Sequence, residues 1–204
     1  MLSFTDSVQA IGVTDINVKD LGVSMLSFSA HKFGGPKGVG VLYIKNGVKI
    51  SPIITGGHQE RAKRGGTSNV AGAVGLATAL EKARRNLSEE VNRIRQLKEE
   101  FIRGVINEVP TAVVNGGEPS LPGVVNINFK RDGEALLYAL DINGVCASLG
   151  AACSSGTIEP SHVLKEIGLS TEDAKYSLRF SFYKQNTLEE VKEAVKIIKK
   201  ISER

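Results

Sequence analysis

The residues best suited to covalent chemistry are Lys32 and its neighbours. Lys32 follows His31 and lies between an apolar, strand-like run and the glycine-rich segment 34–38. A lysine amine condenses with a carbonyl where it loses its proton readily, which burial and nearby positive charge favour. Lys32 is therefore a candidate for carrying an aldehyde cofactor. The alternative is a surface lysine in a strand-to-turn connection.

Two polar residues near the N-terminus could complete such a site. Asp6 and Gln9 follow a short apolar run, which predicts the end of a buried strand. Pyridoxal phosphate chemistry needs an acid at the ring nitrogen, because the protonated ring withdraws electrons from the substrate carbon. Asp6 could supply this acid, and Gln9 could donate a hydrogen bond to the ring hydroxyl oxygen. Both residue types are also common in turns.

A glycine-rich, basic segment predicts a phosphate site. Residues 55–69 contain two pairs of glycines, two arginines and the hydroxyl of Thr67, and they open an apolar helical run. Backbone amides, a hydroxyl and a helix N-terminus together favour a phosphate. Because the segment lacks the spacing of a Walker motif, it does not predict a nucleotide-binding loop. We place the Thr67 hydroxyl on the phosphate.

The two cysteines have different surroundings. Cys146 lies in the strand-like run 144–147, which is typical of an inert, buried thiol, whereas Cys153 lies among glycine, alanine and serine residues. A reactive thiol needs access and a depressed pKa, so Cys153 is the candidate nucleophile. The pair has neither the Cys-x-x-Cys spacing nor that of a metal site, so neither a redox disulfide nor bound zinc is predicted.

Taken together, these motifs resemble the cysteine desulfurases, pyridoxal phosphate enzymes of the class V aminotransferase group. The resemblance covers essentially all 204 residues and places the chain in the C-terminal half of that family's longer chain. It implies an α/β protein of the pyridoxal-phosphate-dependent transferase fold type I. The motifs that carry it, similar in order and spacing, are 121–126, 132–137, Cys153, 159–164 and 178–181.

The resemblance implies two domains. Residues 1–84 would form part of a large cofactor-binding domain with a mainly parallel sheet, and residues 85–204 a small C-terminal α/β domain that carries the cysteine segment. The missing half of the large domain would leave the pocket incomplete. It could belong to a separate chain, to a longer protein from which this one was cut, or to a gene that has been truncated.

The resemblance also implies roles for the cofactor residues. Lys32 would hold the cofactor aldehyde, Asp6 would pair with the ring nitrogen, and Gln9 would contact the ring hydroxyl. Ser29 and His31 would hold the phosphate.

Three further roles follow from the same resemblance. Thr67 would reach the phosphate in a neighbouring subunit, which implies a homodimer. Arg179 would bind the substrate carboxylate, because its planar guanidinium matches two oxygens, although it could instead pair with a buried carboxylate. Cys153 would attack the sulfur of L-cysteine and leave L-alanine and a Cys153 persulfide. The segment after Cys153 resembles the branch that serves iron–sulfur scaffolds and tRNA thiolation, so a sulfur-acceptor protein is the expected partner.

Two other functions are left open. A class V aminotransferase relative would bind the cofactor without forming a persulfide, and Cys153 argues against it. A truncated, non-catalytic interaction module would keep only a docking or dimer surface, and the retained Lys32, Asp6 and Thr67 count against it.

Composition narrows the range of partners. The chain carries a net charge of +4, but its basic residues alternate with acidic ones instead of forming one stripe, so direct DNA binding is not expected. The longest apolar stretch, residues 71–80, is too short to span a bilayer. We expect a cytoplasmic protein.

Hydrophobic periodicity predicts the elements that position these residues. Thr187 and Glu190 form a capping-box pattern at the start of a last helix. The apolar face of this helix is formed by Leu188, Val191, Val195, Ile198 and Ile201. The other expected elements are strands at 38–44, 124–129 and 145–147, a tight turn at 45–48, and helices from 68, at 88–108 and at 133–143.

Overall fold

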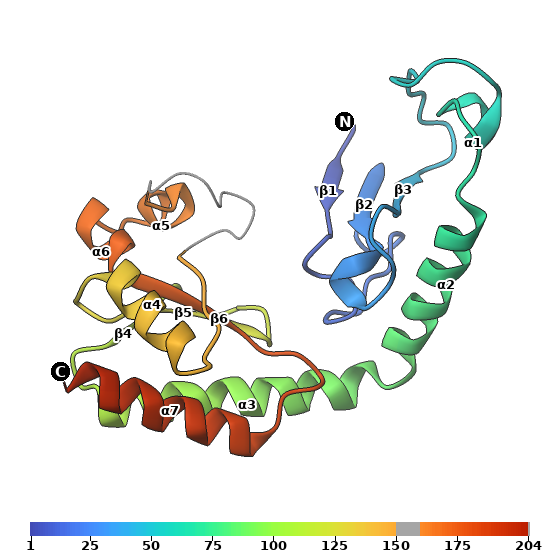
Figure 1. Ribbon diagram of the computed structural model, residues 1–204. Coiled ribbons are helices and arrows are strands. Elements are labelled where there is room, and N and C mark those ends of the chain that lie inside the picture. The colour runs from blue at the N-terminus through green and yellow to red at the C-terminus, as the bar shows by residue number, and fades with distance from the viewer. Residues whose placement is uncertain (150–159, 204) are drawn as a thin grey trace. The chain divides into compact units, whose positions relative to one another are not determined.

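A computed structural model describes residues 1–149 and 160–203 (Figure 1). The chain divides into two compact units, Met1–Ser88 and Glu89–Arg204, and each is described by itself. The sequence places its domain boundary slightly earlier, between residues 84 and 85. In the part of the chain that is described, no helix is both long enough and apolar enough to cross a membrane.

Unit 1 contains a three-stranded sheet in the order β1-β2-β3. Strand β1 (Phe4–Asp6) pairs in parallel with β2 (Met25–Ser29), which pairs antiparallel with β3 (Gly40–Ile44). The expected strand at 38–44 and the turn after it are confirmed, the turn by a hydrogen bond from the Val48 N–H to the Lys45 carbonyl. The expected strand that ends near Asp6 is confirmed as β1, but its expected burial is wrong, because Phe4 is 57% exposed and Asp6 is also exposed.

A short 3₁₀ turn, η1 (Ala30–Phe33), follows β2 directly. Its Ala30 and Phe33 side chains are buried against Leu76, so the turn is fixed by its apolar residues. Gly34 ends the turn in the left-handed conformation at φ 86°, which glycine adopts without steric cost. A Cβ on Gly35 would lie 2.8 Å from the Cβ of Ala30, so any residue other than glycine would clash at this position.

Two helices complete unit 1. Helix α1 (Gln59–Ala62) is a single exposed turn, and α2 (Val70–Arg85) begins after Asn69, whose side chain accepts a hydrogen bond from the Gly72 N–H. This confirms the expected helix after residue 68. Helix α2 contacts η1 and contributes Leu76 to the small core.

Unit 2 contains a second three-stranded sheet, in which all pairings are antiparallel. Strand β5 (Val124–Asn128) lies between β4 (Val113–Asn115) and β6 (Ser177–Ser181). The expected strand at 124–129 is confirmed, but the one at 145–147 is wrong. Only Ser148 pairs there, as an isolated bridge to Arg179.

Helices cover one face of this sheet. The expected helices at 88–108, at 133–143 and after Thr187 are confirmed as α3 (Leu87–Glu108), α4 (Gly133–Ile142) and α7 (Leu188–Ser202). They share one core with alternate residues of β5 and β6, including Ile127 and Leu178, which are completely buried. Burying one such side chain contributes about 1.5 to 3 kcal/mol.

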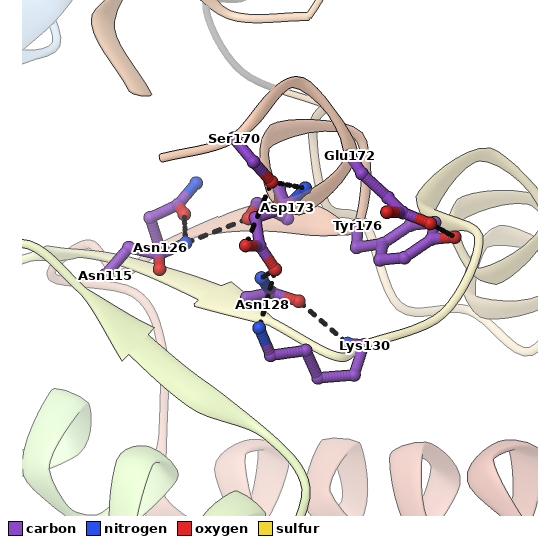
Figure 2. A network of polar contacts seen from close by, with 9 residues as sticks. Asn115, Asn126, Asn128, Lys130, Ser170, Glu172, Asp173 and Tyr176 are labelled. Carbon is purple, nitrogen blue, oxygen red and sulfur yellow. Dashed lines mark hydrogen bonds and ion pairs between the residues drawn. The ribbon is translucent and has the colours of Figure 1, made fainter. Parts of the chain in front are cut away.

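The opposite face of the sheet is polar. Alternation along β5 turns Asn126 and Asn128 away from the helical core. The two short helices α5 (His162–Glu166) and α6 (Thr171–Lys175) precede β6, and α6 hydrogen-bonds to this polar face (Figure 2).

Candidate functional site

The carboxyl ends of β1 and β2 bring several candidate residues to one edge of the unit 1 sheet. Asp6 ends β1 and lies opposite Ser27 in register, and Ser29 ends β2 two residues further along the chain. Lys32 follows in η1. In α/β proteins, ligands bind outside the carboxyl ends of parallel strands, so this edge is a candidate binding site.

Asp6 is held by the turn that follows β1. One of its carboxylate oxygens accepts a hydrogen bond of 2.9 Å from the Val8 N–H, and the Ser7 N–H donates to the Ser27 carbonyl at 2.8 Å. The second Asp6 oxygen has no partner within residues 1–149 and 160–203. Asp6 and Gln9 are both exposed. Asp6 therefore shapes the turn and still offers an acceptor.

The residues on and after β2 present unpaired polar groups. The side chains of Ser29, His31 and Lys32 make no hydrogen bond or ion pair with the described residues. Ser29 and Lys32 are half-buried, whereas His31 is exposed. The Lys32 amine is thus placed on a turn whose apolar side chains are buried, and no carboxylate of the described residues pairs with it.

Thr67 lies in the exposed segment before α2. Its carbonyl accepts from Arg64 Nη1 at 3.5 Å, and Arg64 also donates to the Gly66 carbonyl at 2.9 Å and pairs with Glu60 at 3.5 Å. Arg64 therefore holds the segment together. No hydrogen bond or ion pair in the described chain joins Thr67 to Lys32.

Arg179 belongs to unit 2, in β6. Its backbone exchanges two hydrogen bonds with Ser148, of 3.1 and 2.7 Å. Its Nε is buried, and no partner for it lies within the described ranges. Such an orphaned cationic donor is suited to an anion that arrives from outside the fold. Cys153, the other residue expected to act on substrate, lies outside the described residues.

Cys146 corrects an expectation. The thiol predicted to be buried and inert is exposed. The reason is local, because residues 145–147 do not join the sheet and leave that side chain uncovered.

A polar network on the second sheet contains residues for which the sequence predicts no role (Figure 2). Asp173 on α6 accepts hydrogen bonds from Asn128 Nδ2 at 2.7 Å, from Lys130 Nζ at 2.6 Å and from Ser170 Oγ at 3.0 Å. These hydrogen bonds hold the pKa of the Asp173 carboxyl below its usual range, and the bond from Lys130 has the largest effect.

A second group of hydrogen bonds lies beside this carboxylate. The side-chain nitrogen of Asn115 donates to both Asn126 Oδ1 and Ser177 Oγ.

A comparison with protein families identifies the group to which the chain belongs. The model of the class-V aminotransferases matches residues 1–194. This chain belongs to that family. The class V part of the expected resemblance is thereby confirmed.

Individual relatives give a consistent result. The chain is 49% identical over 201 residues to a protein of Clostridium botulinum strain Hall named cysteine desulfurase IscS, and the match covers 97% of this chain and 51% of that protein. The chain thus spans about half the length of the curated relatives that it matches.

Solved structures support the fold. A protein described as NifS-like has a TM-score of 0.89 and 38% identity, with 98% of this chain and 52% of the other covered. A NifS-like protein from Rickettsia africae has a TM-score of 0.88 and 30% identity, with coverage of 98% and 53%. These likenesses confirm the expected α/β fold of the pyridoxal-phosphate-dependent transferases over about half of its length.

Proposed function

We propose that this chain is the C-terminal half of a cysteine desulfurase that uses pyridoxal phosphate to take sulfur from L-cysteine. The observation that carries the proposal is the shared edge of β1 and β2, where one Asp6 carboxylate oxygen and the Lys32 amine have no partner among the residues that the structure describes. Relatives named cysteine desulfurase at up to 49% identity support the same reaction.

The groups at this edge fit pyridoxal phosphate. An acid suits the ring nitrogen, an amine suits the aldehyde, and the Ser29 and His31 side chains offer hydrogen-bond donors for the phosphate. Thr67 of the neighbouring subunit would add a hydroxyl to the same phosphate. When bound, the cofactor supplies a protonated ring that stabilises negative charge at the substrate carbon. In the described chain, no residue pairs with the side chains of Ser29, His31 and Lys32. A bound cofactor would supply these missing partners.

In this proposal each residue has a defined task. Asp6 would hold the ring nitrogen in its protonated form, and Gln9 would donate to the ring hydroxyl oxygen. Lys32 would hold the cofactor through its aldehyde group, and its amine would be the base that carries the substrate's α-proton. Arg179 binds the substrate carboxylate through paired donors.

Sulfur transfer then requires a nucleophile. The Cys153 thiolate attacks the sulfur of L-cysteine, so a sulfur–sulfur bond forms while the carbon–sulfur bond breaks. The carbon takes the electron pair and a proton and becomes the methyl group of L-alanine. Cys153 is left as a persulfide, in which the transferred sulfur is oxidised relative to a thiol.

The proposal includes partners. We infer a cytoplasmic homodimer in which Thr67 serves the neighbouring subunit's phosphate site. An iron–sulfur scaffold or another sulfur-acceptor protein would take the persulfide sulfur. The part of the cofactor domain that the relatives have and this chain does not would come from a further polypeptide segment.

The decisive experiment follows cofactor absorbance. The chain, alone and after co-expression with the N-terminal half of a relative, is titrated with pyridoxal phosphate. We expect a near-visible band that Lys32→Ala abolishes and Lys37→Ala retains, since Lys37 is an exposed lysine of the same glycine-rich segment. A band that survives Lys32→Ala in both forms, or its absence from both, contradicts the proposal.

The same material tests the sulfur step. With L-cysteine we expect alanine and a protein persulfide, both lost in Cys153→Ser. If the band forms but alanine production survives the serine substitution, the chain is a class V relative without persulfide chemistry.

A further inference from the structure

Four polar residues form one row across the second sheet. Register places Asn115 opposite Asn126, Asn126 opposite Arg179, and Arg179 opposite Ser148. Directly opposed residues of antiparallel strands project to the same side, so the row lies on the face away from the helical core.

Asn126 and Arg179 form the close type of antiparallel pair. The backbone N–H and carbonyl of Arg179 both form hydrogen bonds with Ser148, so neither can bond to β5. The pair of Asn126 and Arg179 is therefore of the non-hydrogen-bonded type, in which the side chains approach most closely. The nearest guanidinium donor to the sheet is Nε, which is the buried atom without a partner in the described chain.

The orientation of the Asn126 amide is set by a relay of hydrogen bonds (Figure 2). The Asp173 carbonyl can only accept, so the Ser177 hydroxyl donates to it at 2.6 Å. The Ser177 oxygen must then accept from Asn115 Nδ2 at 2.9 Å, and the same nitrogen donates to Asn126 Oδ1 at 2.7 Å. The oxygen of Asn126 is thus engaged, while its NH₂ makes no hydrogen bond to the described residues.

We propose that Asn126 is a second donor for the carboxylate that Arg179 binds. Resting on the proposed function, this inference assigns to Asn126 a direct contact with the amino-acid substrate. Nε of Arg179 and Nδ2 of Asn126 come from adjacent strands, and neither has an acceptor among residues 1–149 and 160–203, so one carboxylate would satisfy both. Asn115 and Ser177 are positioning residues, because they turn the Asn126 donor outward.

The test compares two amines that differ in the carboxylate alone. L-Cysteine and cysteamine carry the same amine and thiol, and cysteamine has no carboxylate. Binding of each is followed by the change in cofactor absorbance of the pyridoxal-phosphate-loaded protein, in a Cys153→Ser background that prevents sulfur transfer. The quantity measured is the ratio of the two half-saturating concentrations.

We expect Asn126→Ala to reduce the preference for L-cysteine about tenfold or more, as for the loss of one hydrogen bond to a charged group. Arg179→Ala should reduce it further, and cysteamine binding should be unchanged in both. Asn143→Ala removes an exposed asparagine at the C-cap of α4, whose side chain bonds only the Ala139 carbonyl among the described residues, and should leave the ratio intact. A general loss of structure would weaken both amines equally.

A second variant tests the relay and covers the case in which Asn126→Ala does not fold. An aspartate at 115 can only accept, so Asn115→Asp should turn the Asn126 amide over and aim its oxygen at the carboxylate. The preference for L-cysteine should fall although Asn126 and Arg179 are unchanged.

Two outcomes separate this inference from the proposed function. If the ratio responds to Arg179→Ala and not to either asparagine variant, the inference is wrong and the proposed function stands. If wild type binds neither amine, the proposed function fails and this inference with it.

Discussion

At the scale of single residues, Asp173 joins three segments of unit 2. Its carboxylate accepts from Asn128 on β5, from Lys130 just after that strand, and from Ser170 before α6. Asn128 is only 2% exposed, so its amide depends on this acceptor. The carboxylate therefore fixes α6 against the polar face of the sheet.

The lowered pKa of Asp173 predicts the direction of a pH effect. A carboxyl whose pKa is lower in the folded state adds stability that is present at neutral pH and is lost as the pH falls through the folded pKa. Asp173→Asn should lower the thermal midpoint at neutral pH, and its deficit relative to wild type should shrink in acid. Circular dichroism melts over a pH series measure this.

A matched control lies on the same helix. Among the described residues, the Glu172 carboxylate accepts only from the Tyr176 hydroxyl, at 2.8 Å on the surface, so Glu172→Gln should shift the midpoint little at any pH. A deficit of Asp173→Asn that stays constant down to strongly acidic pH would show that the carboxylate charge is not what stabilises the network.

At the scale of elements, the start of α7 contains a complete capping box. Thr187 Oγ1 accepts from the Glu190 N–H at 3.2 Å, and the Glu190 carboxylate accepts from the Thr187 N–H at 3.1 Å. We expect Thr187→Ala to destabilise unit 2 by about 1 kcal/mol, the usual cost of a lost cap. Denaturant unfolding measures this, with Thr171→Ala on α6 as a control because that hydroxyl bonds to none of the described residues. Equal losses in both variants would argue against the cap.

The sequence predicts the long helices and the strands β3 and β5, but not the shortest elements of unit 2. Helix α3 carries Val91, Ile94, Leu97, Phe101 and Val105 at helical spacing, and all of these except Val91 are buried. Strand β4 and helices α5 and α6 are three to five residues long, which leaves no period to detect. The run at 145–147 has the composition of a strand but forms none, because pairing depends on neighbours that local sequence does not contain.

Some residues of the candidate sites could be predicted from the sequence, and others could not. Lys32 and Asp6 could be found because each lies where an apolar run meets a turn, and their positions as potential ligands follow from residue type. The relay through Asn115 and Asn126 could not be found, because it depends on strand register and on Ser177, 62 residues from Asn115. Alternation along 124–129 was the one available signal, since it puts both asparagines of β5 on one face.

At the scale of the whole molecule, the two units differ in the size of their cores. The buried cluster of unit 1 consists of Ala30, Phe33 and Leu76, whereas that of unit 2 draws on α3, α4, α7 and two strands. Apolar side chains of unit 1 remain exposed, including Phe4 and, at 98%, Ile53. Little apolar surface is therefore removed from water in unit 1.

This difference predicts unequal protection from hydrogen exchange. Amides of β5 should exchange slowly because their opening exposes the larger core, and amides of β2 should exchange much faster. Mass spectrometry of deuterated peptides over 25–29 and 124–128 measures both. Equal protection of the two strands in the isolated chain, at all protein concentrations, would contradict the expectation. A rise in β2 protection with concentration would indicate that a second polypeptide covers unit 1.

The turn at Lys32 has a mechanical consequence. The Ala30 carbonyl accepts from the N–H groups of both Gly34 and Gly35, and Gly35 leaves no room for a side chain. These contacts restrain the backbone on both sides of the lysine α-carbon, so we expect movement of the side-chain nitrogen to come from rotations about the side-chain bonds. In the proposed reaction, the amine would then pass from one bond partner to another without a shift of the surrounding backbone.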